Sequence, residues 1–476
     1  MFLNIENHGQ GNVAAVDESG AILHYGQLCD CVGQMSQLLQ SRSLVFSFCE
    51  NTIGSPVGYI SFMSNGMVQL LLDRDMPAVL VTGLVETYNP SFIWAPVDKC
   101  LWTPADRGLP ELRAIFSGWG YHLYETGLHP FPLHCDLALL VTTSGSTGSP
   151  KLVRQSYGNI VSNTRSIAAY LKIGDSERPI TTLPMQYVYG TSIVNTHLMQ
   201  GATLLLTTKG FMQKEFWQFF TEQGATSIAG VPYTYEMLKK LRFTEMNLPT
   251  LRTMTQAGGK LLPDLHKEFA QYAIDNGKEF VVMYGAAEAT ARMGYLPPGK
   301  SLEKYGAMGI AIPGGRFDLV DDVGNIVPKV GTVGQLVYYG DNVTLGYAEC
   351  GADLAKGDER YGRLETGDMA TRDEDGYYTI VGRKKRFLKI YGNRVGLDET
   401  ERLIKTHLGG VECACCGVDD KMYIFITDGL MKKGLLDFIS RYTGLNTKAF
   451  VIKTLDEIPK NDAGKTLYSK LEEYYE

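Results

Sequence analysis

Residues 142–151 read TTSGSTGSPK and follow a short apolar run, residues 137–141. The apolar run predicts a buried strand. The small hydroxyl residues and two glycines after it supply N–H and O–H donors, and glycine lets the backbone approach a ligand closely. Lys151 adds a positive charge at the end of the stretch. We therefore predict a phosphate-binding loop, with candidate contacts from Thr143, Ser144, Gly145, Ser146, Thr147 and Gly148.

Two other interpretations of this stretch are weaker. A flexible Ser/Gly linker has a similar composition, but linkers rarely follow a buried strand and end in Pro-Lys. The nucleotide-binding pattern GxxxxGK[ST] fails as well, because no Gly-Lys-Ser/Thr follows the first glycine at the required spacing.

The composition is that of an ordinary globular protein. The chain has 476 residues, 44% apolar and 20% charged, so about three domains or subdomains are expected. Its net charge of −7 argues against a dedicated nucleic-acid partner. The N-terminus lacks the features of a signal peptide, and no apolar run approaches the ~18 residues of a membrane span. Nine cysteines, odd in number and mostly scattered, predict free thiols in a reducing cytoplasm.

The first 136 residues alternate between helical and strand-like patterns. Residues 25–39 have helical spacing of apolar side chains, and residues 45–49 predict a strand. An apolar helix is expected after the turn at 51–55, up to residue 72, followed by a strand at 78–82. Strand, helix and strand in this order predict a parallel α/β layer.

The middle of the chain places glycines and aromatic residues at the ends of predicted strands. Ser156 is a candidate N-cap for a helix at 157–171. The strand predicted at 251–256 runs into Gly258-Gly259, where a flat ligand can lie against the backbone. The strand at 281–284 ends in YGAAE at 284–288, which offers a ring for stacking and a hard oxygen ligand for Mg²⁺.

The last third is rich in glycine-bounded strands and ends in a small α/β region. Residues 303–380 predict a barrel-like subdomain. His407 with Cys413, Cys415 and Cys416 could suggest zinc, but the spacing matches no common zinc pattern, so a buried strand at 411–418 is favoured. Four basic residues at 383–386 could suggest a nucleic-acid patch, but their flanks are strand-like and the chain is acidic.

Five stretches, taken together and in order, resemble the adenylate-forming superfamily of acyl-CoA synthetases, aryl-acid ligases, luciferases and peptide-synthetase adenylation domains. The stretches are 144–151, 284–288, 366–368, 382–394 and 459–465. The resemblance implies an α/β fold with a large N-terminal domain of mixed layers, residues 1–383, including the barrel-like subdomain. It also implies a small mobile C-terminal α+β lid domain, residues 384–476.

The resemblance also implies roles for single residues, with ATP and Mg²⁺ as cofactors. The loop after residue 142, with Lys151, would hold the β- and γ-phosphates. Adenine would lie near Gly258, Gly259, Tyr284 and Gly285. Glu288 would bind Mg²⁺, and Asp368 and Arg383 would contact the ribose. In the lid, Lys465 would stabilise the charge that develops during adenylation. Lys385 would be the hinge, and Gly392 would line the thiol channel.

The acyl pocket of the family maps onto Tyr187, Val188, Gly190, Ala257 and Met283. Tyr187 stands where histidine is usual, and a buried aromatic cluster is the competing interpretation there. Amino-acid-activating members carry an aspartate at the position of Val188, so this chain favours an acid without an α-amino group. Arg292 could reach a polar substrate group, but a surface ion pair is favoured.

The predicted function is that of an AMP-forming acid–thiol ligase. It would convert a carboxylic acid to acyl-AMP and then transfer the acyl group to CoA or to the phosphopantetheine of a carrier protein. Ala287 replaces a threonine that contacts the α-phosphate in the family, so a weakened adenylation-fold protein acting as a binding or scaffold module stays open. An amino-acid-activating ligase and a luciferase-like oxidoreductase stay open as well.

Overall fold

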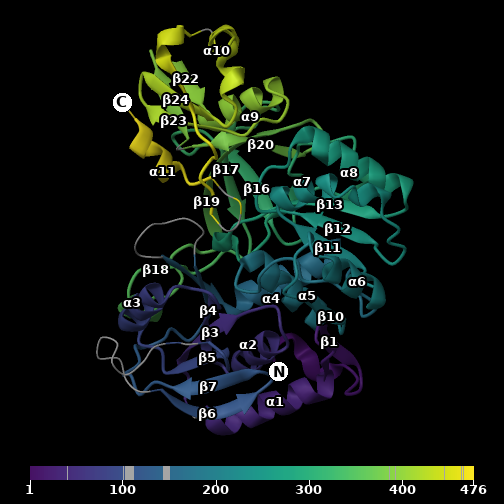
Figure 1. The fold of residues 1–476 in the computed structure, drawn as a ribbon. Coiled ribbons are helices and arrows are strands. Elements are labelled where there is room, and N and C mark those ends of the chain that lie inside the picture. The colour runs from purple at the N-terminus through teal and green to yellow at the C-terminus, as the bar shows by residue number, and fades with distance from the viewer. Residues whose placement is uncertain are drawn as a thin grey trace. The chain divides into compact units, whose positions relative to one another are not determined.

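A computed structural model of the chain describes residues 1–39, 41–99, 101, 112–142, 151–384, 386–391, 393–443, 445–461, 464 and 466–475. Two compact units form, shown with their elements in Figure 1. Unit 1 contains Met1–Arg316 and Tyr339–Leu364, and unit 2 contains Phe317–Tyr338 and Glu365–Glu476. No helix in the described ranges is both long and apolar enough to cross a membrane.

Unit 1 is built around a mixed sheet with the strand order β18-β9-β8-β4-β3-β5-β7-β6 among its described residues. The neighbours β8-β4-β3-β5 run parallel, whereas β9, β7, β6 and β18 pair antiparallel. The strands are β3 (Leu44–Cys49), β4 (Val68–Asp73), β5 (Phe92–Pro96), β6 (Arg113–Gly118), β7 (Tyr121–Glu125), β8 (Leu137–Thr142), β9 (Leu152–Ser156) and β18 (Gly346–Ala348).

Helices pack on both faces of this sheet because side chains alternate along its strands. In β3, Phe46 and Phe48 pack with Val81 and Val85 of α3 (Ala78–Tyr88) in one cluster. Val45, next to Phe46, belongs to a different cluster with residues of α1 (Tyr25–Leu38) and α2 (Gly54–Ser64). Burial on both faces explains why β3 is apolar almost throughout.

Two of the predicted elements near the N-terminus are wrong. Residues 78–82 form the start of helix α3, not a strand, and residues 68–73 form strand β4, not the end of a helix. Both runs are short and apolar, and periodicity alone does not separate a buried strand from a buried helix. The predicted helix at 25–39 and strands at 45–49 and 137–141 are confirmed as α1, β3 and β8.

A second sheet of unit 1 carries most of the predicted pocket residues. Within the described residues its order is β11-β12-β13-β14-β15, with β11, β12 and β13 parallel. Phe280 of β13 packs against Tyr235 of α7 and Phe269 of α8 on one face, which these two helices cover in Figure 1. The elements are α6 (Lys214–Glu222), α7 (Pro232–Lys240), α8 (Pro263–Asp275), β11 (Ser227–Gly230), β12 (Thr253–Gln256), β13 (Glu279–Tyr284), β14 (Gly294–Tyr295) and β15 (Ile310–Ala311).

The other face of this sheet meets α4 (Tyr157–Tyr170) and α5 (Val188–Met199). Ser156 caps α4 as predicted, because its hydroxyl accepts from the Asn159 N–H across 3.0 Å. Met283 of β13 and Tyr189 of α5 share a cluster on this face. A small sheet of order β10-β1-β2 completes the described strands of unit 1: β1 (Val13–Asp17), β2 (Ile22–His24) and β10 (Leu204–Leu206).

Unit 2 holds the glycine-bounded strands and the C-terminal α/β region. Among its described strands, one sheet has the order β16-β17-β19-β20, a hairpin joins β21 to β22, and a third sheet has the order β23-β24-β25. The bounds are β16 (Arg316–Val320), β17 (Gly334–Tyr339), β19 (Arg363–Arg372), β20 (Tyr378–Arg383), β21 (Phe387–Ile390), β22 (Asn393–Gly396), β23 (Cys413–Val418), β24 (Lys421–Ile426) and β25 (Phe450–Thr454), with helices α9 (Leu397–His407), α10 (Leu435–Thr443) and α11 (Tyr468–Leu471).

The C-terminal sheet has apolar clusters on both faces. Cys413 and Cys415 of β23 point to a cluster with α9 and α10, whereas Cys416 lies in a cluster with Leu471 of α11. The three cysteines thus follow the alternation of a buried strand, and His407 stacks on Phe438 with ring centroids 3.7 Å apart. The strand that the sequence predicted here is confirmed.

Candidate functional site

The predicted phosphate loop connects two neighbouring antiparallel strands. Thr142 at the end of β8 pairs with Leu152 at the start of β9, so the two ends of the loop are adjacent. The loop contacts predicted at Thr143, Ser144, Gly145, Ser146, Thr147 and Gly148 lie outside the described residues, as do Lys385, Gly392 and Lys465. Lys151 is described, and its Nζ lies 2.6 Å from Oε1 of Glu349.

Glu288 and Lys151 meet at Tyr347 of β18. The Tyr347 hydroxyl donates to Oε1 of Glu288 across 2.7 Å, and the Lys151 ammonium lies 5.7 Å from the centre of the same ring. The Arg360 guanidinium lies 4.6 Å from that ring centre. Burial and the neighbouring Glu288 carboxylate raise the pKa of Tyr347 to about 12, so its hydroxyl keeps the proton that it donates.

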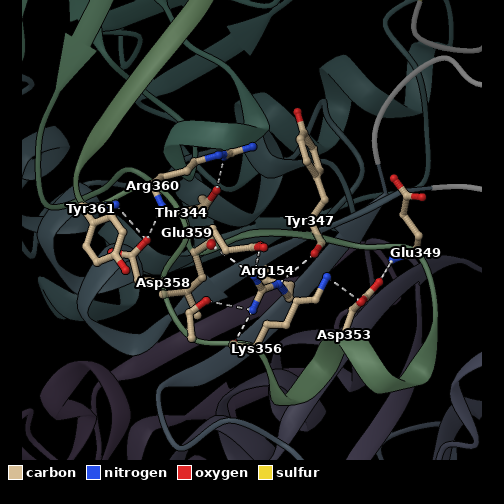
Figure 2. A network of polar contacts seen from close by, with 12 residues as sticks. Arg154, Thr344, Tyr347, Glu349, Asp353, Lys356, Asp358, Glu359, Arg360 and Tyr361 are labelled. Atoms are coloured by element: carbon tan, nitrogen blue, oxygen red, sulfur yellow. Dashed lines mark hydrogen bonds and ion pairs between the residues drawn. The ribbon is translucent and has the colours of Figure 1, made fainter.

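The main chain at Glu288 is held as well as its carboxylate. Its carbonyl accepts from the Thr344 N–H across 3.0 Å and from Nη1 of Arg360 across 3.1 Å. Arg360 also donates to the Thr344 hydroxyl across 2.6 Å, a contact visible in Figure 2. The segment around residue 344 therefore fixes both the position and the orientation of Glu288.

A buried arginine holds this segment on the sheet. Arg154 of β9 is fully buried, and its guanidinium donates to the carbonyls of Tyr347, Leu345, Gly357 and Lys356 and to the Glu359 carboxylate. Figure 2 shows the guanidinium between the chain at Tyr347 and the loop at Lys356. Nearby, Asp353 pairs with Lys356 across 2.8 Å, which with further hydrogen bonds lowers its pKa to about 2. Sequence reasoning missed this network because its members are up to 205 residues apart.

The residues predicted to bind adenine lie at the ends of β12 and β13. Tyr284 is half-buried at the last position of β13. A Cβ at Gly285 would lie only 1.8 Å from the Ala291 carbonyl oxygen, so no larger residue fits there. Gly258 has a φ of +86°, and a Cβ on it would lie 2.7 Å from the Tyr187 hydroxyl. Gly259 follows it in the same turn.

The predicted pocket residues fall into two groups. Tyr187, Ala257 and Met283 belong to one apolar cluster, together with Tyr189. Val188, at the start of α5, packs instead against the cluster of the large sheet. Gly190 lies in the first turn of α5, where a Cβ would come within 2.1 Å of the Pro184 carbonyl oxygen.

Arg292 is not the surface ion-pair residue that the sequence suggested. Its side chain is 3% exposed, and it lies with its guanidinium 3.8 Å from the centre of the Tyr189 ring. The expectation was wrong because side chains from α4 and from a distant segment hold the main chain at Arg292. Asn163 and Asn342 donate to the Arg292 carbonyl across 2.9 and 2.8 Å. The signal that could have been used is its apolar flanks, Ala291 and Met293.

Ala287 stands where the resembling family has threonine, and its surroundings show whether a neighbour supplies the hydroxyl. Ala287 is half-buried, with only a methyl group facing its neighbours. Thr290 does not supply the missing hydroxyl, because its own hydroxyl is buried and donates to the Asn342 carbonyl across 2.7 Å.

Unit 2 brings Asp368 and Arg383 together. They are direct partners across β19 and β20, with the Arg383 Nε 3.1 Å from Oδ1 of Asp368. The Asp368 N–H donates to the Thr366 hydroxyl across 3.1 Å, which steadies the part of β19 that carries the carboxylate. A carboxylate held in place on a strand is suited to accept hydrogen bonds from a pair of hydroxyls.

Tyr468 belongs to a cluster of charged side chains in unit 2. Its hydroxyl donates to Oε2 of Glu401 across 3.0 Å, and its ring lies 3.5 Å from the Arg386 guanidinium. Arg386 also pairs with Glu401 across 2.6 Å and with Asp398 across 2.5 Å. The tyrosine therefore completes a largely buried charge cluster that joins α9 to α11.

Comparison with known proteins gives a consistent result. A family model described as AMP-binding enzyme matches residues 3–348. The chain is 29% identical over 357 residues to an oxalate–CoA ligase of Saccharomyces cerevisiae, an alignment covering 70% of this chain and 62% of that protein. A feruloyl-CoA synthase of Amycolatopsis is 29% identical over 347 residues, covering 70% and 68%. The chain thus spans less than two thirds of the length of the oxalate–CoA ligase.

The fold has a solved counterpart. The o-succinylbenzoate CoA synthetase of Bacillus subtilis, solved with its acyl-adenylate intermediate, superposes with a TM-score of 0.78 at 19% identity. The match covers 99% of this chain and 97% of that one. The predicted α/β fold class is confirmed.

Proposed function

Because the chain belongs to the AMP-binding enzyme family, we propose that it activates a carboxylic acid with ATP and passes the acyl group to a thiol. In the first step the carboxylate attacks the α-phosphorus, and pyrophosphate leaves. In the second step the thiol attacks the acyl carbonyl, AMP leaves, and the thiol proton is released. We take CoA as the acceptor, since the relatives named above are CoA ligases; a carrier-protein thiol is the second candidate.

The observation that carries this proposal is the convergence of Lys151 and Glu288 on Tyr347. The Lys151 ammonium and a carboxylate oxygen of Glu288 both contact the Tyr347 side chain, and Lys151 directly follows the loop proposed to hold phosphates. This donor set fits a nucleotide with a magnesium ion, because the cation meets phosphate and the carboxylate meets the metal. Magnesium held by Glu288 would neutralise phosphate charge during the first step.

We propose the contacts to the base and the ribose from the places of Tyr284 and Asp368 on their strands. Tyr284, at the end of β13, offers its half-buried ring to the base beside the Gly258-Gly259 turn. Asp368, steadied by Thr366 and paired with Arg383, offers its carboxylate to the ribose hydroxyls. The Ala287 methyl group offers the α-phosphate no donor, so we expect a slower first step than a threonine would give.

The lid remains part of the proposal. Lys465 would carry its charge to the α-phosphate, the chain would swing at Lys385 after adenylation, and Gly392 would then admit the thiol. The small domain would begin at residue 384. We also propose a cytoplasmic location, which the eight described free cysteines support.

ATP–pyrophosphate exchange with a panel of acids, with and without CoA, tests the proposal. We expect acid-dependent exchange that Lys465→Ala and Glu288→Gln each reduce at least about 100-fold, the scale of removing a charge that acts on the transition state. Lys470→Ala is the matched control, because Lys470 is an exposed lysine on the same C-terminal segment. Absence of exchange with every acid, amino acids included, would instead favour a binding module.

A further inference from the structure

A mostly apolar cavity lies in unit 1 between α4, α5 and the sheet of β11, β12 and β13. Apolar side chains of α4, α5 and the three strands form most of its lining, with a few polar groups among them. The residues that matter for its chemistry are Glu177, Tyr189, His197, Thr255, Met283 and Arg292. Met283 is also one of the residues predicted for the acyl pocket.

Arg292 brings a permanent charge into this cavity. Arg292 is almost fully buried, with 3% of its surface exposed. Its Nε donor has no hydrogen-bond partner, and Nη1 donates to the neighbouring Ala291 carbonyl, 3.1 Å away. The hydroxyls of Tyr170 and Tyr189 lie near the guanidinium, but they are uncharged and do not balance its charge. No carboxylate among the described residues lies within ion-pair distance of Arg292. A buried guanidinium without an anionic partner is costly, so its presence in this cavity indicates an anionic ligand.

The other groups around the guanidinium do not neutralise it. Among the described residues that line the cavity, Glu177 is the only carboxylate. It pairs with Arg252 across 3.0 Å and accepts a hydrogen bond from the Thr226 hydroxyl. Tyr189 presents its ring face to Arg292, while its hydroxyl donates to Thr255 across 2.8 Å. The Tyr170 hydroxyl donates to the Met283 sulfur across 3.0 Å. His197 is neutral at ordinary pH, because burial lowers its pKa to about 4.

We propose that the acid activated by this chain carries a second acidic group, a carboxylate or a similar oxyanion, that pairs with Arg292. This inference rests on the proposed function and specifies its substrate class. The guanidinium fork matches an oxyanion geometrically, and the apolar walls around it strengthen the pairing. An acid with an apolar end would leave the Arg292 charge buried without a partner, which selects against it.

The test compares dicarboxylic acids of three to eight carbons with their monomethyl esters, which keep the length and lose one charge. Binding is measured by calorimetry and activation by ATP–pyrophosphate exchange. In the wild type we expect at least one diacid to bind and react roughly 30-fold better than its ester, the scale of a buried charge pair. Arg292→Met should remove that preference by lowering binding and exchange of the diacid to the level of its ester. Arg292→Lys should restore part of it.

The unfolding midpoint separates a ligand-binding arginine from a structural one. Arg292→Met keeps the main-chain bonds to Asn163 and Asn342, which do not depend on the side chain. Because it removes a charge without a partner, the unliganded variant should be at least as stable as the wild type. A clear loss of stability, together with an unchanged diacid preference, would overturn the inference.

The outcomes also separate this inference from the proposed function. Exchange with monoacids but neither binding nor exchange with any diacid overturns the inference and leaves the function standing. Arg292-dependent binding of a diacid without exchange by any acid overturns the function and supports the ligand class. Neither binding nor exchange with any acid overturns both.

Discussion

The Tyr347 hydroxyl donates to a carboxylate oxygen of Glu288 across 2.7 Å, although the two residues are 59 positions apart in the chain. The bond orients the carboxylate proposed to hold magnesium. We expect Tyr347→Phe to lower the exchange rate roughly tenfold and to raise the Mg²⁺ concentration needed for half-maximal rate, since a hydrogen bond to a charged group contributes about 1.5–3 kcal/mol. A magnesium titration of exchange measures both effects.

Tyr361→Phe is the control for that variant. It also removes a tyrosine hydroxyl from unit 1, but at a residue that is 84% exposed. If Tyr347→Phe and Tyr361→Phe have the same magnesium dependence, Glu288 does not depend on Tyr347.

Arg154 should determine the stability of the segment that carries Tyr347. Arg154→Lys removes several donors from a fully buried site, including the donor to the carbonyls of Lys356 and Gly357, so we expect the free energy of unfolding to fall by at least about 3 kcal/mol. Glu359→Gln should cost about 1 kcal/mol or less, because that carboxylate is half exposed. Urea unfolding compares the two variants, and equal losses would contradict the central role of Arg154.

Local patterns predicted much of the fold, because buried strands and capped helices are encoded by neighbouring residues. The strand at 137–141 and the Ser156 cap were correct for this reason. The runs at 68–73 and 78–82 were assigned wrongly. The first is apolar and almost wholly buried, so it carries no period, and in the second the exposed Val79 and Leu80 are as apolar as the buried Val81.

The candidate site was less predictable where it depends on distant parts of the chain. Single motifs gave Glu288, Tyr284 and Asp368, each in or just after a strand. The contact of Tyr347 with Glu288 joins segments that have no shared pattern, and the burial of Arg292 depends on Asn163 and Asn342 from two other segments. The Tyr347–Glu288 contact follows from packing between distant segments, so the sequence alone contained no usable signal for it. For Arg292, the apolar neighbours Ala291 and Met293 were a signal of burial.

Ala287 gives a test in which activity should increase. Ala287→Thr would restore a hydroxyl donor for the α-phosphate, and we expect exchange to become roughly tenfold faster, since charge-assisted hydrogen bonds are strong. Ala287→Val has nearly the same shape without the hydroxyl and should bring no increase. Initial rates at saturating ATP compare the three proteins, and a gain shared by both variants would assign the effect to packing.

Two buried histidines should make the fold sensitive to mild acid. Burial lowers the pKa values of His197 and His266 to about 4 from the ordinary 6.5, and the Gly306 N–H donates to Nδ1 of His266, which requires the neutral ring. The unfolded chain therefore binds more protons between these values, so stability is full above about pH 6.5 and falls as pH decreases toward 4, by about 3 kcal/mol for each histidine. Urea midpoints between pH 7 and 5 measure the slope. His266→Gln should lose about half of it, whereas the exposed His129→Gln should keep it; an unchanged slope in His266→Gln would place the acid sensitivity elsewhere.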